Sequence, residues 1–323
     1  MKTIFGLVAL IFVFGINSCD KVDNPFPKAI NTDLDTTIYP GLWNDYLQNE
    51  WPDFSTIPND NPNRNALIED FTGHNCSFCP EAGAIAHGIH ENNPTRIFVA
   101  SIHASNTVNG LSSFQDTNSA LGYTIPFWNA VGLELGSFFG NSLPNSGFFG
   151  NPGGTISRTN DAGEYFPASG SWLTKANAVI NSDLKVAIKA KLNYFETPKH
   201  GFFLHTEVEK LDNQLNNDLA MVVYLIEDSL VGPQNVQNVY TPNYVHRDIM
   251  RATLDNTAWG RTLTSDLMTN GKYYLNYSYI LPNQLAQSGV VTSHNAENMH
   301  VLIYVYDLET LEIYQVIKKK ITA

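Results

Sequence analysis

The second half of the chain alternates apolar and polar residues with a period of two. In residues 184–194 (LKVAIKAKLNY) every second side chain is apolar and most of those between are lysine. This period is typical of a half-buried antiparallel strand. Six such strands with few helices predict an immunoglobulin-like β-sandwich over residues 183–323. The other runs are 201–209, 219–228, 272–281, 300–307 and 311–319, the last two joined by a hairpin at Leu308, Glu309 and Thr310.

The preceding part of the chain has a different pattern. Residues 66–71 and 96–103 are short apolar runs that predict buried strands, and the helix-forming segment 79–94 lies between them and ends at a proline. A further helix is expected over 171–181. The order strand, helix, strand predicts a βαβ unit, and we assign residues 64–182 to an α/β domain.

The N-terminal residues have the pattern of an export signal. A lysine precedes the apolar stretch 4–16, which is the length of a secretory h-region and too short for a permanent membrane helix. Residues 16–18 followed by Cys19 resemble a bacterial lipoprotein cleavage box. We therefore expect 1–18 to be a lipoprotein signal peptide and Cys19 to be lipidated, which anchors the protein to the membrane. An ordinary signal peptide with an incidental cysteine is the alternative.

Residues 19–63 hold six of the sixteen prolines, which disfavours long helices and central strands. The first part of this segment is expected to be a tether. Aromatic residues return between Tyr39 and Phe54, so that part is expected to pack on the body of the protein.

Composition narrows the function further. The 323 residues carry a net charge of -12, and the basic run is Lys318–Lys320, which argues against nucleic acid as a partner. No other segment approaches eighteen consecutive apolar residues. The export signal indicates the envelope of a Gram-negative cell, where thiols are kept oxidised unless a dedicated reductant reaches them.

Two of the three cysteines, Cys76 and Cys79, form a CxxC pair at the predicted strand-to-helix junction. A thiolate is the reactive form of cysteine, and a helix N-terminus favours the anion because its free N–H groups and dipole attract negative charge. We therefore expect Cys76 near the start of the helix, with Cys79 within bonding distance. Pro80 is compatible with the first turn.

This pair has three other interpretations. A metal site would use Cys76 and Cys79 with His87 and His90, or with His74, but one continuous helix could not easily turn both pairs onto one ion. Haem attachment fails because position 80 is proline instead of histidine. A purely structural disulfide stays open, although so small a ring constrains the unfolded chain little.

The residues EDFTGHNCSFCP resemble the thioredoxin superfamily, whose first core strand ends in an acidic residue six before the first active cysteine. The resemblance implies a thioredoxin-like fold for 64–182. It also implies that Asp70, six residues before Cys76, is the buried proton acceptor for the resolving thiol of Cys79. A solvated or turn-capping carboxylate is the alternative, and Glu69 is a competitor on the opposite face of the strand.

The chain also resembles a family of envelope lipoproteins named after a twenty-eight-kilodalton outer membrane protein, which join a thioredoxin-like domain to a C-terminal β-domain. The resemblance implies an outer-membrane location. It rests on four segments: the FTGxxCxxCP core at 71–80, SIHAS at 101–105, NPGGTISR at 151–158 and YVHRDIMR at 244–251.

In thioredoxin-like folds a cis-proline faces the dithiol. The NPGGTISR segment makes Pro152 our choice, with 155–159 as the strand that follows, and Pro144 is the rival. His74 and His103 are candidates to stabilise a thiolate, although each is also compatible with a structural role. His246, Arg247 and Arg251 are expected to orient a loop of the β-domain.

The sequence therefore supports two functions. The first is a lipid-anchored thiol–disulfide oxidoreductase that needs no cofactor, in which Cys76 attacks a partner disulfide and Cys79 resolves the mixed disulfide. Its partners would be protein thiols and disulfides of the envelope. The second is a non-catalytic surface lipoprotein that binds a protein or glycan, with the CxxC as a structural disulfide.

Overall fold

The computed structural model describes residues 33–59, 62–107, 111–281, 284–287, 290–293 and 295–322. Within them the α-helices are α1 (Trp43–Asn49), α2 (Cys79–Asn92), α3 (Ala130–Ser137) and α4 (Trp172–Ile180). The largest sheet contains β1 (Ala66–Thr72), β2 (Ile97–His103), β3 (Gly153–Ile156), β6 (Leu219–Glu227), β9 (Ile249–Thr253), β10 (Arg261–Thr262), β15 (Met299–Asp307) and β16 (Ile313–Lys320). A second sheet contains β4 (Val186–Phe195), β5 (Gly201–Lys210), β11 (Met268–Thr269) and β12 (Lys272–Ile280), and two hairpins pair β7 (Leu230–Val236) with β8 (Val239–His246) and β13 (Gln284–Gln287) with β14 (Val290–Ser293).

The periodic segments form the elements that their patterns predict. The βαβ unit is present as β1, α2 and β2, and the helix expected over 171–181 is α4. The six alternating runs are β4, β5, β6, β12, β15 and β16, and β15 and β16 pair as an antiparallel hairpin. The strand expected over 155–159 differs, because β3 begins at Gly153 and ends at Ile156.

The large sheet joins strands from both sides of the boundary predicted at 182/183. Its order is β16-β15-β6-β9-β2-β1-β3, with β10 paired to β6. The strands β2 and β9 meet at Ser101 and Ile249, where the Ser101 N–H donates to the Asp248 carbonyl at 2.8 Å. The protein is thus a mixed α/β structure with several sheets, and its C-terminal half is rich in β-strands.

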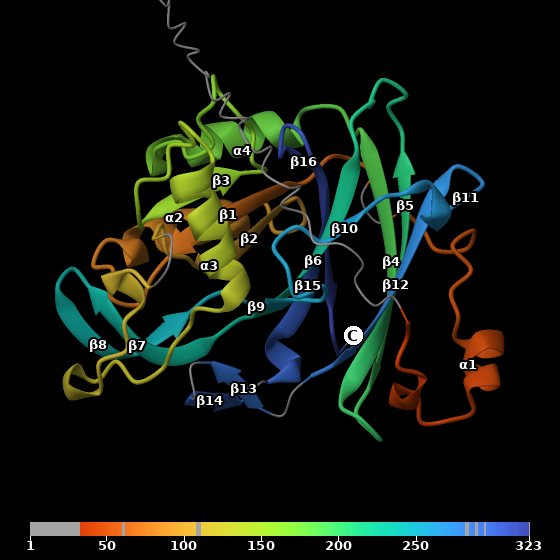
Figure 1. The fold of residues 1–323 in the computed structure, drawn as a ribbon, viewed down its shortest axis with the longest axis horizontal. Coiled ribbons are helices and arrows are strands. Elements are labelled where there is room, and N and C mark those ends of the chain that lie inside the picture. The colour runs from red at the N-terminus through yellow and green to blue at the C-terminus, as the bar shows by residue number, and fades with distance from the viewer. Residues whose placement is uncertain are drawn as a thin grey trace, which may run out of the picture.

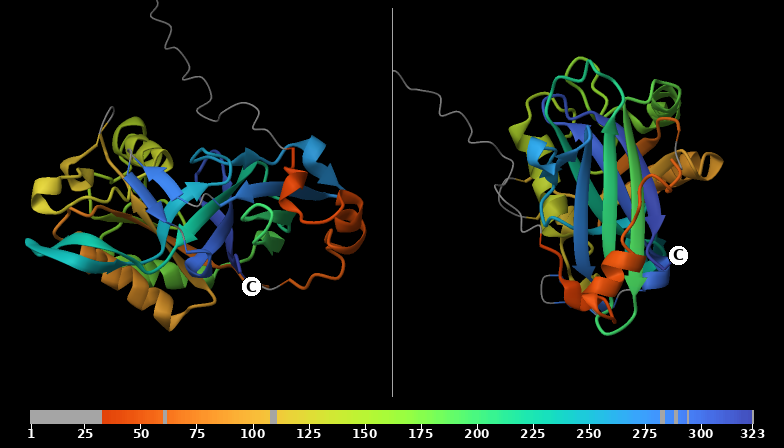
Figure 2. Two further views of the ribbon diagram at one scale, coloured as in Figure 1. Left: turned by 90° about the horizontal axis from the view of Figure 1, so that it is seen from below. Right: turned by 90° about the vertical axis from the view of Figure 1, so that its right-hand side faces the viewer.

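The strand β6 shows why this sheet is apolar on both faces. Its even-numbered residues, such as Tyr224, belong to a core beneath α3. Its odd-numbered residues, such as Val223, belong to a second core shared with β4, β5 and β12. A strand covered on both faces is uniformly apolar, as LAMVVYLI is. Figures 1 and 2 show the layers: α3 lies against one face of the large sheet, whereas α2 and α4 lie against the other face at β1 and β2. The second sheet covers that other face at β6 and β15.

The N-terminal aromatic segment packs on the body, as the sequence predicts. Tyr46 of α1 is buried against Phe203 of β5, and its hydroxyl is hydrogen-bonded to Nε2 of His205 at 2.7 Å. Trp43 stacks on the Tyr46 ring with a centroid distance of 4.9 Å. The helix α1 therefore covers the outer face of the second sheet, at the right of Figure 1.

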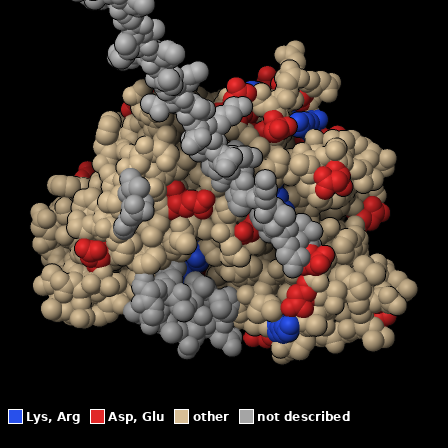
Figure 3. Space-filling model, in the orientation of Figure 1, with Lys and Arg blue, Asp and Glu red and all other residues tan. Residues whose placement is uncertain are grey.

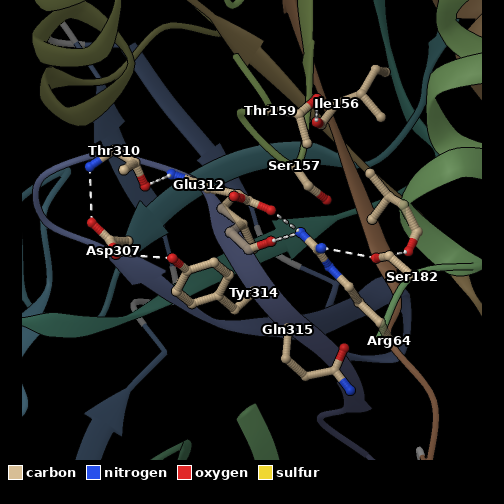
Figure 4. Close-up of polar contacts among 12 residues, drawn as sticks. Arg64, Ile156, Ser157, Thr159, Ser182, Asp307, Thr310, Glu312, Tyr314 and Gln315 are labelled. Atoms are coloured by element: carbon tan, nitrogen blue, oxygen red, sulfur yellow. Dashed lines mark hydrogen bonds and ion pairs between the residues drawn. The ribbon is translucent and has the colours of Figure 1, made fainter. Parts of the chain in front are cut away.

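Arg64, just before β1, ties the N-terminal part of the large sheet to its last strand. Its guanidinium donates to the Ser182 hydroxyl at 2.9 Å, to the Glu312 carboxylate at 2.6 Å and to the Ile313 carbonyl at 2.9 Å (Figure 4). Because Arg64 is only 4% exposed, water cannot replace these bonds if they are lost.

The surface reflects the acidic composition. Acidic side chains are spread over the face drawn in Figure 3, and the basic ones are scattered among them without forming a stripe. The described residues on this face therefore give no footprint for a phosphate backbone.

Candidate functional site

The two cysteines lie in the connection between β1 and α2. They form a disulfide with an S–S distance of 2.11 Å and a Cα–Cα distance of 5.4 Å. Two turns shape the connection: the Cys76 N–H donates to the Gly73 carbonyl at 3.1 Å, and the Cys79 N–H donates to the Cys76 carbonyl at 3.3 Å. The CxxC is therefore at the strand-to-helix junction, as predicted.

The helix starts where the segment 79–94 predicts, but Cys76 lies farther from its start than we expected. The helix α2 begins at Cys79, with Phe78 at the N-cap and Pro80 in the first turn. The turn from Cys76 to Cys79 comes first, so Cys76 lies three residues before the helix and Cys79 is its first residue. The free N–H groups of the first turn are accordingly closest to Cys79 in sequence.

Both cysteines are buried, Cys76 with 2% and Cys79 with 1% of its surface exposed. The β7–β8 hairpin covers the connection that holds them. The Asn235 N–H donates to the His74 carbonyl at 2.8 Å, and the Gln237 N–H donates to the Ser77 carbonyl at 3.0 Å. The hairpin projects from the same end of the molecule as α2 and α3 (Figure 1).

A cavity of about 370 Å³ lies beside the disulfide, and Cys79 and Asp70 both line it. Cys76 is not among its lining residues. The cavity thus brings one sulfur-bearing residue and the predicted proton acceptor together. The cavity is also lined by Gly83, His87, Glu91, Gln234, His246 and Arg247.

Asp70 is a buried carboxyl group without a charged partner among the described residues. Desolvation raises the pKa of Asp70 to about 7. In the part of the chain that the structure describes, its Oδ1 has no hydrogen-bond partner, and a Cβ added to Gly83 would lie 3.5 Å from its Oδ2. The carboxyl group therefore faces the first turns of α2, near Cys79, and can change its protonation state near neutral pH.

Glu69, the competitor for this role, is part of a buried ion pair. The Arg158 guanidinium donates to both of its carboxylate oxygens, at 2.8 and 2.7 Å, and the hydroxyls of Thr155 and Tyr224 donate to it as well. Burial acts to raise the pKa of Glu69, but the charge and hydrogen bonds of Arg158 outweigh burial and lower the pKa. Glu69 is therefore a fixed anion, and of the two carboxyl groups Asp70 is the one able to exchange a proton.

The Asn151–Pro152 peptide bond is cis. Pro144, the rival choice, is not preceded by a cis peptide bond in the described residues. The side-chain amide of Asn151 donates to the carbonyls of Thr72 and Ala104, at 2.8 and 2.9 Å. Gly153, the next residue, pairs with Phe71. These contacts place Pro152 beside the ends of β1 and β2, and its role in a reaction stays a prediction.

The histidines proposed to stabilise a thiolate, His74 and His103, lie in a buried aromatic cluster, and His103 also lines the cavity beside Cys79. His74 and His103 pack around Phe127, and the centroid of the His246 ring lies 4.2 Å from the centroid of the Phe127 ring. Desolvation lowers the pKa of His74, holds the pKa of His103 well below 6.5 and lowers that of His246 to about 3. These imidazoles are neutral at physiological pH, so they offer no positive charge to a thiolate.

Sequence reasoning missed the β7–β8 hairpin and the part that the segment 244–251 plays at the site. His246 and Arg247 line the cavity, and the Asp248 carbonyl joins β9 to β2. Arg251 forms a buried ion pair with Glu227 at 3.4 Å. The motif at 244–251 indicated in the sequence that this segment matters. The cavity that it lines becomes visible only once β9 is paired with β2 in the fold.

The metal alternative receives no support from the arrangement of side chains. Within the described part of the chain, no group of three or more His, Cys, Asp or Glu residues is arranged to hold a metal ion. Cys76 and Cys79 are bonded to each other.

The comparisons with known proteins place the chain in a family. A family model described as Outer membrane protein Omp28 matches residues 144–323, which is more than half of the chain. The chain belongs to the Omp28 family. The matched residues include the motifs at 151–158 and 244–251, whereas the CxxC and the segment 101–105 lie outside them. Membership places this protein in the outer membrane.

Two solved structures extend the comparison. This Omp28-family chain is similar in fold to HBP35 of Porphyromonas gingivalis, with a TM-score of 0.58 and 18% identity over 81% of this chain and 76% of that one. A domain of the outer membrane lipoprotein Omp28 from the same organism has 23% identity and a TM-score of 0.29, over 42% of this chain and 88% of that one. No curated protein sequence matches the chain.

The membrane anchor predicted for this family member lies outside the structure. Cys19 and the predicted signal peptide 1–18 fall among the residues that are not described. In the described residues, no helix combines the length and the apolar character needed to cross a membrane.

Proposed function

We propose that this Omp28-family protein is a thiol–disulfide oxidoreductase of the outer membrane and that Cys76–Cys79 is its redox group. The observation that carries the proposal is the cavity that Cys79 and Asp70 both line, since Asp70 is a buried carboxyl group whose pKa of about 7 suits proton exchange with a thiol. A disulfide kept only for stability needs no proton acceptor beside it.

The arrangement of elements supports a thioredoxin-like fold around this pair. The strands β1 and β2 are parallel and are connected by α2, and β3 is antiparallel to β1. The cis Asn151–Pro152 bond immediately precedes β3. We also propose that the second sheet and the C-terminal strands of the large sheet correspond to the immunoglobulin-like sandwich that the sequence predicts.

The reaction follows from these groups. In the reduced protein the Cys76 thiolate attacks a partner disulfide, forms a mixed disulfide and releases one partner thiolate. Asp70 takes the proton of Cys79, whose thiolate then attacks the Cys76 sulfur. The Cys76–Cys79 bond forms, the second partner sulfur leaves, and two electrons pass from the protein to the partner. The reverse sequence oxidises a partner dithiol.

The partners and the anchor belong to the same proposal. The substrates would be protein thiols and disulfides of the envelope, and the exposed ring of Phe78, 62% exposed beside Cys79, offers them an apolar contact. Lipidation of Cys19 would hold the protein at the membrane, as the cleavage box at 16–19 indicates.

The burial of both cysteines favours a second candidate function. Reactive cysteines are at least partly exposed, whereas structural ones are buried and inert. On this alternative the protein is a binding lipoprotein of the outer membrane, and the disulfide fastens the turn before α2.

A trapping experiment separates the two functions. In a Cys79→Ser variant the resolving thiol is missing, so we expect covalent complexes with envelope proteins to accumulate through Cys76, visible on non-reducing gels and lost on reduction. A Cys76→Ser/Cys79→Ser variant that retains Cys19 is the matched control. A Cys79→Ser protein that forms no more complexes than this control would favour the binding function.

A further inference from the structure

The β7–β8 hairpin closes the Cys76 side of the disulfide. Besides the main-chain bonds from Asn235 and Gln237, the Gln234 side-chain amide donates to the carbonyls of Gly73 and Cys76, each at 3.2 Å. The Asn235 amide also donates to the Asn75 carbonyl at 3.3 Å. The hairpin thus bonds to each residue from Gly73 to Ser77, in the way that an added strand bonds to an open edge.

The hairpin also contacts the rest of the protein away from residues 73–77. Gly232 packs so closely on Phe127 that an added Cβ would lie 2.6 Å from the ring. The Tyr240 hydroxyl donates to the Gly122 carbonyl at 3.2 Å. An extended polypeptide would have to displace bonded backbone to lie along Cys76.

The Cys79 side is different, because it faces the cavity. A cavity of about 370 Å³ falls within the range of small-molecule sites, about 300–1,000 Å³. Polar groups surround it: the side chain of Arg247 is 53% exposed, that of His87 is 19% exposed, and Glu91 lies beside them. A small polar molecule fits this space.

We propose, on the basis of the function above, that the β7–β8 hairpin selects substrates by size. Small polar thiols reach the disulfide through the cavity and attack Cys79. Polypeptide substrates reach Cys76 only after the hairpin leaves the turn.

The step at Cys79 balances in atoms and electrons. A small thiolate bonds to the Cys79 sulfur as the Cys76–Cys79 bond breaks, and Cys76 leaves with the electron pair and takes up the proton that the thiol lost. A second small thiol attacks the sulfur of the bound molecule, which forms a small disulfide and frees Cys79 as a thiol. Two electrons have then passed from two thiols to the protein.

The first test locates the adduct in the intact protein. The oxidised full-length chain is treated with 2-mercaptoethanol, quenched in acid, and analysed by peptide mass spectrometry, which separates Cys76, Cys79 and Cys19. We expect the Cys79 adduct to exceed the Cys76 adduct by about tenfold, because attack through the cavity meets only Cys79. An excess of the Cys76 adduct would overturn the proposal without the use of any variant.

The second test loosens the hairpin. An Asn235→Pro variant lacks the N–H that bonds His74, and Val239→Thr, at a position 63% exposed on the same hairpin, is the matched control. We expect Asn235→Pro to raise the rate of reduction by reduced thioredoxin about tenfold and to leave the rate with 2-mercaptoethanol within about twofold. Only the larger reductant has to displace the hairpin from residues 73–77, whereas the small thiol uses the cavity that Tyr244 and His246 line. Equal changes in both rates would contradict size selection.

These outcomes are distinct from a failure of the proposed function. If Cys79→Ser traps no envelope protein while 2-mercaptoethanol still attacks Cys79, the oxidoreductase is refuted and the access route stands. If partners are trapped but the adduct forms on Cys76, the function stands and the size selection is refuted.

Discussion

Replacing Arg158 with methionine is expected to lower the free energy of unfolding by about 3–5 kcal/mol, the usual cost of breaking a buried ion pair. Arg158 and Glu69 have no exposed surface, so the substitution leaves a carboxylate that water cannot reach. The guanidinium also donates to the hydroxyls of Tyr224 and Tyr304, at 3.2 and 3.0 Å. It therefore joins β1 to the C-terminal strands β6 and β15, and urea denaturation of the oxidised protein measures the loss.

The double variant Glu69→Gln/Arg158→Met is the control for this explanation. Replacing both charges removes the uncompensated carboxylate, so most of the stability should return. A double variant as unstable as Arg158→Met alone would show that the loss comes from packing of the long side chain instead of the stranded charge.

Replacing Asp70 with asparagine is expected to stabilise the protein at alkaline pH and to slow disulfide exchange. Folding raises the pKa of Asp70 from 3.8 to about 7, so the folded state holds a proton that the unfolded state has lost between these values. The stability that this group contributes is complete below pH 3.8 and is lost as the pH rises through 7. The whole difference is on the order of 4 kcal/mol. Because an asparagine side chain does not ionise, the variant should recover about that amount at pH 8.

The direction of the pKa shift of Asp70 is tested by comparing the free energy of unfolding of Asp70→Asn with that of the unmodified protein at two pH values. Buried histidines such as His103 and His246 have lowered pKa values and destabilise the fold in acid, but they are present in both proteins and cancel. The advantage of Asp70→Asn should therefore shrink by roughly 3 kcal/mol between pH 8 and pH 5. Glu69→Gln is the matched control and should destabilise, because Glu69 has a lowered pKa. An advantage of Asp70→Asn that does not change with pH would refute the raised pKa.

The same substitution should slow exchange, because Cys79 then lacks its proton acceptor. We expect the release of a mixed disulfide from Cys76 to slow by about a hundredfold at pH 7, within the usual contribution of general-base catalysis. Hydroxide competes with Asp70 as the pH rises, so the defect should become smaller. Stopped-flow measurements of resolution across this range check both expectations.

The sequence predicts the individual helices and strands well, because the spacing of apolar residues sets their type and glycine and proline mark their ends. The alternation in 184–194 and the apolar runs around the CxxC each specify one strand through their own residues. The alternation of faces in β1 shows that either Asp70 or Glu69 can be the proton acceptor near the CxxC. The sequence cannot decide between them, because the ion-pair partner of Glu69, Arg158, lies almost ninety residues away.

The arrangement of the strands into sheets could not be predicted from the sequence, for a physical reason. A uniformly apolar strand such as β6 indicates burial on both faces but does not identify its neighbours. The pairing of β9 with β2 depends on one short bridge at Ser101. The segment that forms β7 and β8 contains proline, glycine, glutamine and asparagine, so its strands follow from pairing and not from propensity.

The reduction potential of Cys76–Cys79 in the full-length protein tests the central claim most directly. Equilibration with glutathione buffers, followed by mass-spectrometric counting of alkylated Cys76 and Cys79, gives this potential. An exchange centre is expected between about -120 and -270 mV, the range of known exchange proteins. A value below about -300 mV, where structural disulfides of secreted proteins lie, would contradict the account and leave the pair as a fastening of the turn.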